Sequence, residues 1–310
     1  MDRITIDTTA GFFSVLQWND APAGSPRLHF AHATGMHAGL YARLLAPLAD
    51  RYRITASDAR GHGHTPGGAV GDRVEWEAGA EDIVAIIDAV DPAVPWLLAG
   101  HSFGGSASLL AASLRPDRVA GLVMIDPPFI PFEIARAAVA AGTIMPNPMA
   151  DKAGRRRADF PDVATARAAW HGRGVFRSWS DEDLDAYLAD GLLPTADGVT
   201  LACAPAWEAA TFRGVSHRIE PALAAMQRPF ALVAGEEGST VPPAEFAIIA
   251  ANPHCISAQR LPGTTHFVPL ERGDVVRAAI DAVAAAAAGD AVAAAAAEDH
   301  APRAAVPNRA

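Results

Sequence analysis

Short runs of consecutive apolar residues alternate along this chain with longer segments that carry apolar residues at helical spacing. Several of the short runs are apolar throughout, which is typical of strands buried on both faces of a sheet. We expect eight strands, at residues 3–7, 12–18, 28–32, 52–57, 96–99, 119–125, 229–234 and 256–261.

Helical spacing occurs between these runs, at residues 39–49, 75–90 and 103–114. Strands that alternate with helices in this way build a parallel sheet that is covered on both faces. The pattern therefore predicts an α/β fold, with a mostly parallel eight-stranded sheet and helices on both faces.

The alternation stops between residues 128 and 227, where helical spacing continues but no strand is expected. The helices are predicted at residues 131–141, 163–170 and 180–190, and Ser180 is a candidate N-cap because acidic residues follow it directly. We interpret this block as an inserted helical cap, or lid.

The cap divides the sheet domain into two parts of the sequence, residues 1–127 and 228–287. Residues 288–310 form an alanine-rich tail with scattered charged residues. Since this composition offers little to bury, we expect the tail to be frayed or disordered and to have no catalytic role.

The strongest chemical signal is the sequence Gly100-His101-Ser102-Phe103-Gly104. An apolar strand precedes it and a helix of small residues follows. A G-x-S-x-G pattern in this setting makes a tight turn that exposes the serine, and the N-terminus of the next helix points toward the reacting group. Ser102 is therefore the candidate nucleophile.

With these features the chain resembles the α/β-hydrolase superfamily over about residues 3–285. The loop "FAHATGMH" at residues 30–37 is similar to the family's oxyanion loop, although Ala33 stands where the common His-Gly-x-x-Gly version has glycine. The resemblance implies that the backbone N–H groups of Thr34 and Phe103 form the oxyanion hole.

The segment "LPGTTHFVPL" is similar to the family's G-x-x-H-F loop and follows the last expected strand. The resemblance implies that His266 is the base, which takes the proton of Ser102 and later returns it to the leaving group.

The acid is the uncertain member of the triad. In most of the family it follows the seventh strand, three positions beyond a glycine, and here that position holds Gly238. Asp126 ends the sixth expected strand, where some branches carry the acid: one subgroup of haloalkane dehalogenases, zearalenone-type lactonases and cofactor-free quinaldine dioxygenases. Position favours Asp126, and Glu237 is the alternative acid.

Other histidines have different expected roles. His32 and His37 flank the oxyanion loop and are candidates for substrate contact, whereas His101 is expected to pack under the elbow. His62 and His64 form an H-x-H pair, but two ligands do not complete a zinc site, so no metal is expected.

Charge and composition limit the partners. The formal net charge of −10 argues against nucleic acid as a partner. No stretch suits a membrane span, and the first residues carry no secretory signal. The two cysteines, Cys203 and Cys255, are expected to be reduced thiols. Together with the expected lack of a membrane span and of a secretory signal, reduced thiols predict a cytoplasmic protein.

The basic run at residues 155–157 is interpreted as a solvated helix face or a carboxylate anchor.

These features predict a serine hydrolase that cleaves a carboxylic ester or lactone of a small, apolar molecule through an acyl-Ser102 intermediate. No cofactor is implied, because a serine, a histidine and two backbone donors suffice. A cofactor-free dioxygenase and a non-catalytic ligand sensor on the same fold remain alternatives. The sequence leaves open whether the protein forms a homodimer.

Overall fold

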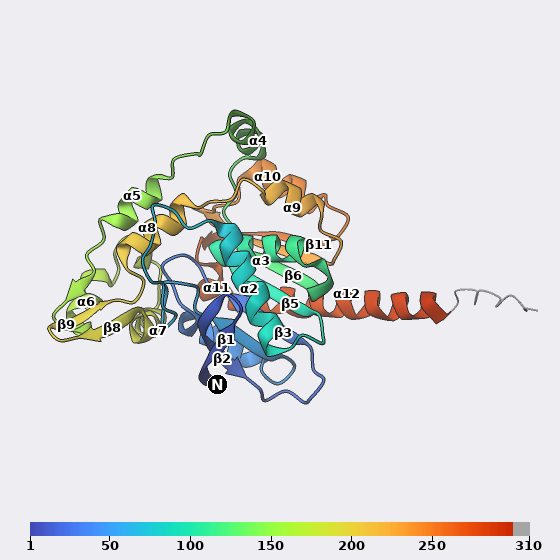
Figure 1. The fold of residues 1–310 in the computed structure, drawn as a ribbon, viewed down its shortest axis with the longest axis horizontal. Coiled ribbons are helices and arrows are strands. Elements are labelled where there is room, and N and C mark those ends of the chain that lie inside the picture. The colour runs from blue at the N-terminus through green and yellow to red at the C-terminus, as the bar shows by residue number, and fades with distance from the viewer. Residues whose placement is uncertain (300–310) are drawn as a thin grey trace, which may run out of the picture.

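The structure, a computed structural model, describes residues 1–299 and is built around a sheet of eight strands in the order β1-β2-β4-β3-β5-β6-β10-β11 (Figure 1). All eight predicted strands are present. Their bounds are β1 Asp2–Thr8, β2 Gly11–Trp18, β3 Arg27–Ala31, β4 Arg53–Ser57, β5 Trp96–His101, β6 Val119–Ile125, β10 Phe230–Glu237 and β11 Cys255–Thr265.

The sheet is mostly parallel, as predicted. The pairs β1–β2 and β2–β4 are antiparallel, whereas the pairs from β4 through β3, β5, β6 and β10 to β11 are parallel. The carboxyl ends of the parallel strands therefore meet at one edge of the sheet, where active sites of open α/β sheets form.

Helices cover both faces of the sheet, because side chains of the central strands alternate between two apolar clusters. On β5, Trp96 and Leu98 pack with helices α2 (Trp76–Val90) and α3 (Phe103–Leu114). Leu97 and Ala99 point the other way, into the cluster that includes Val276 and Ile280 of helix α12 (Gly273–Asp299). Burial on both faces explains why these strands are apolar throughout.

The remaining sheet-domain helices are short. The predicted helix at 39–49 is a succession of η1 Ala38–Tyr41, α1 Ala42–Leu45 and η2 Ala46–Leu48. A 3-10 turn, η3 Pro116–Arg118, precedes β6, and helices α10 Pro243–Ala250 and α11 Val268–Glu271 follow β10 and β11.

The block between β6 and β10 contains the predicted helices α4 Phe132–Ala141, α6 Val163–Trp170 and α7 Asp181–Gly191, and Ser180 caps α7 by accepting a hydrogen bond from the Asp183 N–H. It also contains η4 Gly174–Phe176 and helices α5 Pro148–Gly154, α8 Pro205–Arg213 and α9 Ile219–Ala224.

The expectation that this block lacks strands is wrong. A small antiparallel sheet in the order β7-β9-β8 lies within it, formed by β7 Asp159–Phe160, β8 Leu192–Thr195 and β9 Gly198–Leu201. These strands have only two to four residues, too few for a period-two pattern to be recognised.

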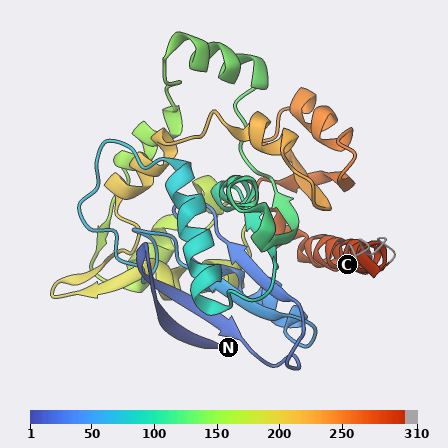
Figure 2. The ribbon, with the colours of Figure 1, turned by 45° about the vertical axis from the view of Figure 1, so that its right-hand side comes forward.

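The cap elements α5, α6, β8 and β9 lie at one end of the molecule and the end of α12 lies at the other, in both Figure 1 and Figure 2. Helix α12 continues through Asp299, so the prediction of a frayed or disordered tail is wrong for residues 288–299. Residues 300–310 lie outside the described part of the chain. Among the described residues, no helix combines the length and the apolar character that a membrane crossing requires.

Candidate active site

Ser102 lies between the end of β5 and the start of α3, in a backbone conformation with φ of 54° and ψ of −123°. Two glycines allow this turn. A Cβ on Gly104 would lie 2.2 Å from the Ala31 carbonyl oxygen, and one on Gly100 would lie 2.3 Å from the Gly104 carbonyl carbon. Only glycine lets the elbow approach the neighbouring strand this closely, as the sequence pattern predicts.

Asp126 follows β6 directly and reaches His266, which follows β11. The Nδ1 atom of His266 lies 2.5 Å from Asp126 Oδ2. Asp126 is fully buried, whereas the His266 side chain is 22% exposed. Asp126 also has positive φ, of 41°, and among described residues other than glycine only Ser102 shares this feature. Such backbone strain costs free energy and is concentrated at functional sites.

Strand β10 and the loop after it, which carries the acid in most of the family, here supply donors to Asp126. The N–H of Gly235 and the hydroxyl of Ser239 donate to Asp126 Oδ1 at 3.0 and 2.6 Å, and the N–H of Thr240 donates to Oδ2 at 3.0 Å. These donors hold the carboxylate so that one oxygen faces His266.

Glu237, the alternative acid, is exposed, and within residues 1–299 no hydrogen bond or ion pair joins it to His266. The neighbouring Glu236 accepts a hydrogen bond from the Gly263 N–H at 2.9 Å. Gly238, at the usual acid position, has φ of 63°, which favours glycine. The structure therefore brings Asp126, and not Glu237, to His266.

The electrostatics of Asp126 follow from these contacts. Burial alone would raise its pKa, but the hydrogen bonds from His266, Ser239 and Thr240 together outweigh burial and hold the pKa below its usual value. The carboxylate is therefore charged at neutral pH and can stabilise a protonated His266.

The backbone N–H groups of Thr34 and Phe103 match what an oxyanion hole requires. Thr34 lies in the turn after β3, and Phe103 is the first residue of α3, where an N–H has no intrahelical acceptor. In the part of the chain that the structure describes, neither N–H donates to a protein acceptor. Both residues are buried, and Phe103 directly follows Ser102 in the chain.

Residues 30–279 match the family model described as "Alpha/beta hydrolase family". The chain belongs to this family. Most of the sheet domain and the whole cap lie within the matched region, and the predictions of the superfamily and of a hydrolase enzyme are confirmed.

Curated relatives of this hydrolase include lipases and other hydrolases. It is 30% identical over 182 residues to lipase LipV of Mycobacterium tuberculosis, which covers 57% of this chain and 61% of that protein. It is 27% identical over 251 residues to 2-(acetamidomethylene)succinate hydrolase of Mesorhizobium japonicum, which covers 78% of this chain and 82% of that protein. The match to LipV thus spans less than two thirds of that relative. Together the relatives support hydrolysis as the general class of activity.

A solved structure, that of E-2-(acetamidomethylene)succinate hydrolase, superposes on this hydrolase with a TM-score of 0.72 and 24% sequence identity. The superposition covers 92% of this chain and 98% of that one. It confirms the α/β-hydrolase fold over the sheet domain and the cap.

The two histidines beside the oxyanion loop of this hydrolase contact protein atoms. His32 Nδ1 lies 2.8 Å from the Ala33 carbonyl oxygen, and its Nε2 accepts a hydrogen bond from the Ala59 N–H at 2.8 Å. His37 Nε2 donates to the Tyr187 carbonyl oxygen at 2.9 Å, and its Nδ1 accepts from the Leu40 N–H at 3.3 Å.

Both rings are 1% exposed, and all four of their nitrogen atoms are engaged. The geometry therefore argues against the predicted contact of His32 and His37 with substrate, because neither ring has a donor or acceptor left for it. Burial also lowers their pKa values, for His32 to about 3, so both rings are neutral at pH 7. They instead hold the oxyanion loop in place.

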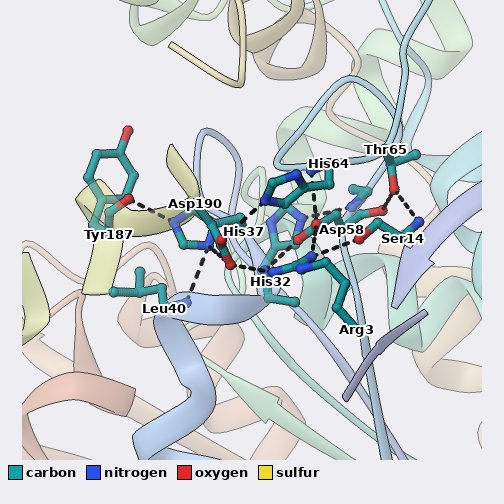
Figure 3. Close-up of polar contacts among 12 residues, drawn as sticks. Arg3, Ser14, His32, His37, Leu40, Asp58, His64, Thr65, Tyr187 and Asp190 are labelled. Atoms are coloured by element: carbon teal, nitrogen blue, oxygen red, sulfur yellow. Dashed lines mark hydrogen bonds and ion pairs between the residues drawn. The ribbon is translucent and has the colours of Figure 1, made fainter. Parts of the chain in front are cut away.

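A polar network joins the sheet domain to the cap next to this loop (Figure 3). Arg3, on β1, donates to Asp58 at 2.8 Å and also to Asp190, at the end of the cap helix α7. Asp190 is 3.1 Å from His64 Nε2, and Asp58 accepts the Ala38 N–H at 2.8 Å. The network fixes α7 against the start of η1. Sequence reasoning did not predict it, since its members are far apart along the chain.

Cap residues also form hydrogen bonds with the oxyanion loop itself. The Tyr187 hydroxyl donates to the Gly35 carbonyl oxygen at 3.3 Å and accepts from Arg156 at 3.3 Å. Arg156 also pairs with Glu208 of α8 at 2.5 Å. Of the two interpretations of the basic run, Arg156 thus fits the carboxylate anchor. The cap and the oxyanion loop form one hydrogen-bonded unit.

His62 and His64 do not gather further ligands. Among the described residues, no group of three or more His, Cys, Asp or Glu side chains is arranged to hold a metal ion. His62 Nδ1 is 3.0 Å from the Arg60 carbonyl oxygen, and His64 pairs with Asp190. Both cysteines, Cys203 and Cys255, are free thiols, as expected.

Proposed function

We propose that this protein is a serine hydrolase that cleaves a carboxylic ester or lactone of a small, apolar molecule through an acyl-Ser102 intermediate. The observation that carries the proposal is the hydrogen bond of Asp126 to His266 Nδ1 on a sheet whose nucleophile elbow presents Ser102. In this proposal Ser102, His266 and Asp126 are the nucleophile, the base and the acid.

In the first half-reaction the Ser102 hydroxyl attacks the carbonyl carbon while His266 Nε2 takes its proton. Asp126 keeps the proton of His266 on Nδ1, which leaves Nε2 free to act as the base. The N–H groups of Thr34 and Phe103 donate to the oxyanion that develops, a contribution of about 3 kcal/mol per donor in other enzymes.

The tetrahedral intermediate then collapses, and His266 gives its proton to the departing alkoxide oxygen. In the second half-reaction a water molecule loses a proton to His266 and attacks the acyl carbon. As this second intermediate collapses, His266 gives the proton to the Ser102 oxygen, which releases the carboxylic acid and restores both residues. For a lactone, the alcohol and the acid are two ends of one product. No cofactor takes part in these steps.

Aromatic side chains near His266 support an apolar substrate. The Phe267 ring lies 5.5 Å from the His266 ring and 5.0 Å from the Trp179 ring, measured between centroids. Trp179 packs in turn on Phe176 at 4.9 Å. Phe267 is half-buried, whereas Phe176 and Trp179 are buried, and apolar side chains are usual near small-molecule sites.

A panel of p-nitrophenyl esters of increasing acyl length, together with several lactones, tests the proposal. We expect saturable hydrolysis of at least one compound and no hydrolysis by Ser102→Ala. If the purified protein turns over none of these compounds, or if Ser102→Ala retains the rate of the wild type, ester or lactone cleavage through Ser102 is wrong.

The cofactor-free dioxygenase deserves a parallel test, because the acid after β6 is a feature that this alternative shares by resemblance. Oxygen uptake against a panel of heteroaromatic substrates separates the two reactions. We expect no uptake above a protein-free control. Stoichiometric uptake that depends on His266 would favour the dioxygenase.

A further inference from the structure

Three hydrogen bonds in series connect the oxyanion loop to the loop of the candidate base. The Ala33 N–H lies 3.3 Å from the hydroxyl oxygen of Tyr41. That hydroxyl lies 2.8 Å from Nδ1 of His101, and Nε2 of His101 lies 2.9 Å from the carbonyl oxygen of His266. Neither Tyr41 nor His101 belongs to the triad or to the oxyanion hole.

The direction of each bond follows from the chemistry of its partners. A carbonyl oxygen only accepts, so His101 Nε2 carries a proton and donates to His266. Burial lowers the pKa of His101 to about 3, which leaves Nδ1 unprotonated at neutral pH. Nδ1 therefore accepts from the Tyr41 hydroxyl, and the hydroxyl oxygen accepts from the Ala33 N–H. Every donor and acceptor in the series is matched.

The series is shielded from water, since Tyr41 is 1% exposed and His101 is fully buried. A buried polar group that loses its partner costs more than an exposed one, so breaking one bond leaves its neighbours unsatisfied. The rings are also packed: His101 lies 4.8 Å from the His266 ring, and Tyr41 lies 4.7 Å from Phe30 on β3.

Both ends of the series lie at the proposed catalytic groups. Ala33 directly precedes Thr34, whose N–H is the proposed oxyanion donor, and the other end is the backbone of the proposed base. The distance between a base and an oxyanion donor must be held closely, because small displacements of reacting groups lower the rate strongly.

We propose that Tyr41 and His101 are positioning residues, which fix the oxyanion loop relative to His266 through this series of hydrogen bonds. The proposal rests on the proposed function of Ser102 and His266. Neither residue supplies a group to the proposed proton transfers, although the His101 ring packs against the His266 ring. The oxyanion and the imidazolium are absent from the complex with unreacted substrate and arise only as the reaction proceeds, so the effect should change kcat rather than KM.

The first test compares Tyr41→Phe with Tyr52→Phe. Each variant loses one buried hydroxyl, but the Tyr52 hydroxyl donates to Asp281 at 2.8 Å, away from the proposed site. Two rates are measured with the wild type and both variants: phosphonylation of Ser102 by a fluorophosphonate probe and hydrolysis of a p-nitrophenyl ester. Phosphonylation needs the nucleophile, the base and the oxyanion hole, but not the natural substrate.

We expect Tyr41→Phe to lower the phosphonylation rate and kcat by about tenfold, less than the 10²–10³ lost when an oxyanion donor is removed outright. KM should change by less than about twofold. Tyr52→Phe should lower the melting temperature without changing either rate. Equal rates in Tyr41→Phe and the wild type, or equal losses in both variants, would overturn the positioning role.

The second test uses His101 and also serves if Tyr41→Phe does not fold. The amide of His101→Gln offers one donor and one acceptor, as the neutral imidazole does, whereas His101→Leu offers neither. We expect Gln to retain a larger share of the phosphonylation rate than Leu. The double variant Tyr41→Phe/His101→Leu should lose less of the phosphonylation rate than the two single losses predict together, because either change already breaks the same series of hydrogen bonds. Equal rates for Gln and Leu would contradict the proposal.

The phosphonylation of the wild type separates the two proposals. If Ser102 of the wild type is not labelled, the proposed function is wrong and the positioning role is wrong with it. If Ser102 is labelled at a normal rate and the variants react as fast as the wild type, only the positioning role is wrong.

Discussion

The carboxylate of Asp126, at the end of β6, accepts a hydrogen bond of 2.5 Å from Nδ1 of His266, at the end of β11. Strand β10 lies between β6 and β11 in the sheet, and the N–H groups of Gly235 in β10 and of Thr240 in the following loop donate to the carboxylate. The proposed acid thus follows a different strand from the acid in most of the family, and the loop that usually carries the acid donates hydrogen bonds to it.

This arrangement predicts a large effect of Asp126→Asn. The amide would stabilise the wrong tautomer of His266, so we expect kcat to fall by roughly 10⁴, the loss found when a triad acid is replaced by its amide. The measurement is steady-state hydrolysis of the best p-nitrophenyl ester. Glu237→Gln is the matched control and should lower kcat by less than about tenfold, because the Glu237 carboxylate is exposed and its interaction with His266 is screened by water. If Glu237→Gln instead lowered kcat by orders of magnitude while Asp126→Asn changed kcat little, the acid would be Glu237 and not Asp126.

A second prediction concerns the nucleophile. Ser102→Ala should abolish ester hydrolysis, because it removes the attacking oxygen, and should leave the fold intact. Alanine tolerates the positive φ at this position no better than serine does, so we expect a change in melting temperature of only a few degrees, equivalent to about 1 kcal/mol. Activity and thermal unfolding are measured on the same preparation. Hydrolysis near the rate of the wild type would be incompatible with acyl-Ser102 chemistry.

Much of this site could be predicted from sequence, because its signals are local. The glycines around Ser102 and the apolar strand before it stand together in ten residues, and Asp126 follows a buried strand without interruption. The alternation of strands and helices likewise gave the sheet, since strands buried on both faces must be apolar throughout.

The rest depends on partners that are distant in the sequence. Arg3 and Asp190 are 187 residues apart, and nothing in either local sequence indicates that they meet. The series from Ala33 through Tyr41 and His101 to His266 joins three separate segments of the chain. The strands of the cap were missed for another reason: they are short and half exposed, so they lack a hydrophobic signal.

A third prediction concerns the C-terminal helix. Within residues 273–292, the part of α12 whose side chains the structure describes, the buried residues that pack on the sheet are Val276, Ala279, Ile280 and Val283, all of which precede residue 289. Deleting residues 289–310 should therefore lower the melting temperature by less than about 2 °C, which corresponds to well under 1 kcal/mol. Activity should be unchanged. A drop of several degrees in thermal unfolding would show that residues beyond Ala288 contribute to the stability of the fold.

The last prediction concerns acid stability. Five buried histidines have pKa values lowered by burial from 6.5: to about 3 for His32 and His101, to about 4 for His29 and His62, and in the same direction for His37. Each ring stays neutral in the folded protein but takes up a proton in the unfolded chain below pH 6.5. Between the pKa of the folded state and the unfolded pKa of 6.5, each histidine therefore binds more protons in the unfolded state. The stability that these histidines contribute is fully present above pH 6.5 and is lost as the pH falls below 6.5.

Each such group changes the free energy of unfolding by about 1.4 kcal/mol per pH unit below pH 6, so several together give a steep loss. The carboxyl groups of Asp58 and Asp126 also have lowered pKa values, but they change the free energy of unfolding only below about pH 4, where an ordinary aspartate takes up its proton. They therefore do not contribute to the pH dependence between pH 5 and 6.

Urea unfolding at pH 7.5, 6.0 and 5.0 measures how the free energy of unfolding changes with pH. His29→Gln is the informative variant, because His29 bonds only Thr55 and Ser57, away from the triad. Its pH dependence should be smaller than that of the wild type by about one proton. A slope unchanged by this substitution would mean that His29 is protonated alike in the folded and unfolded states.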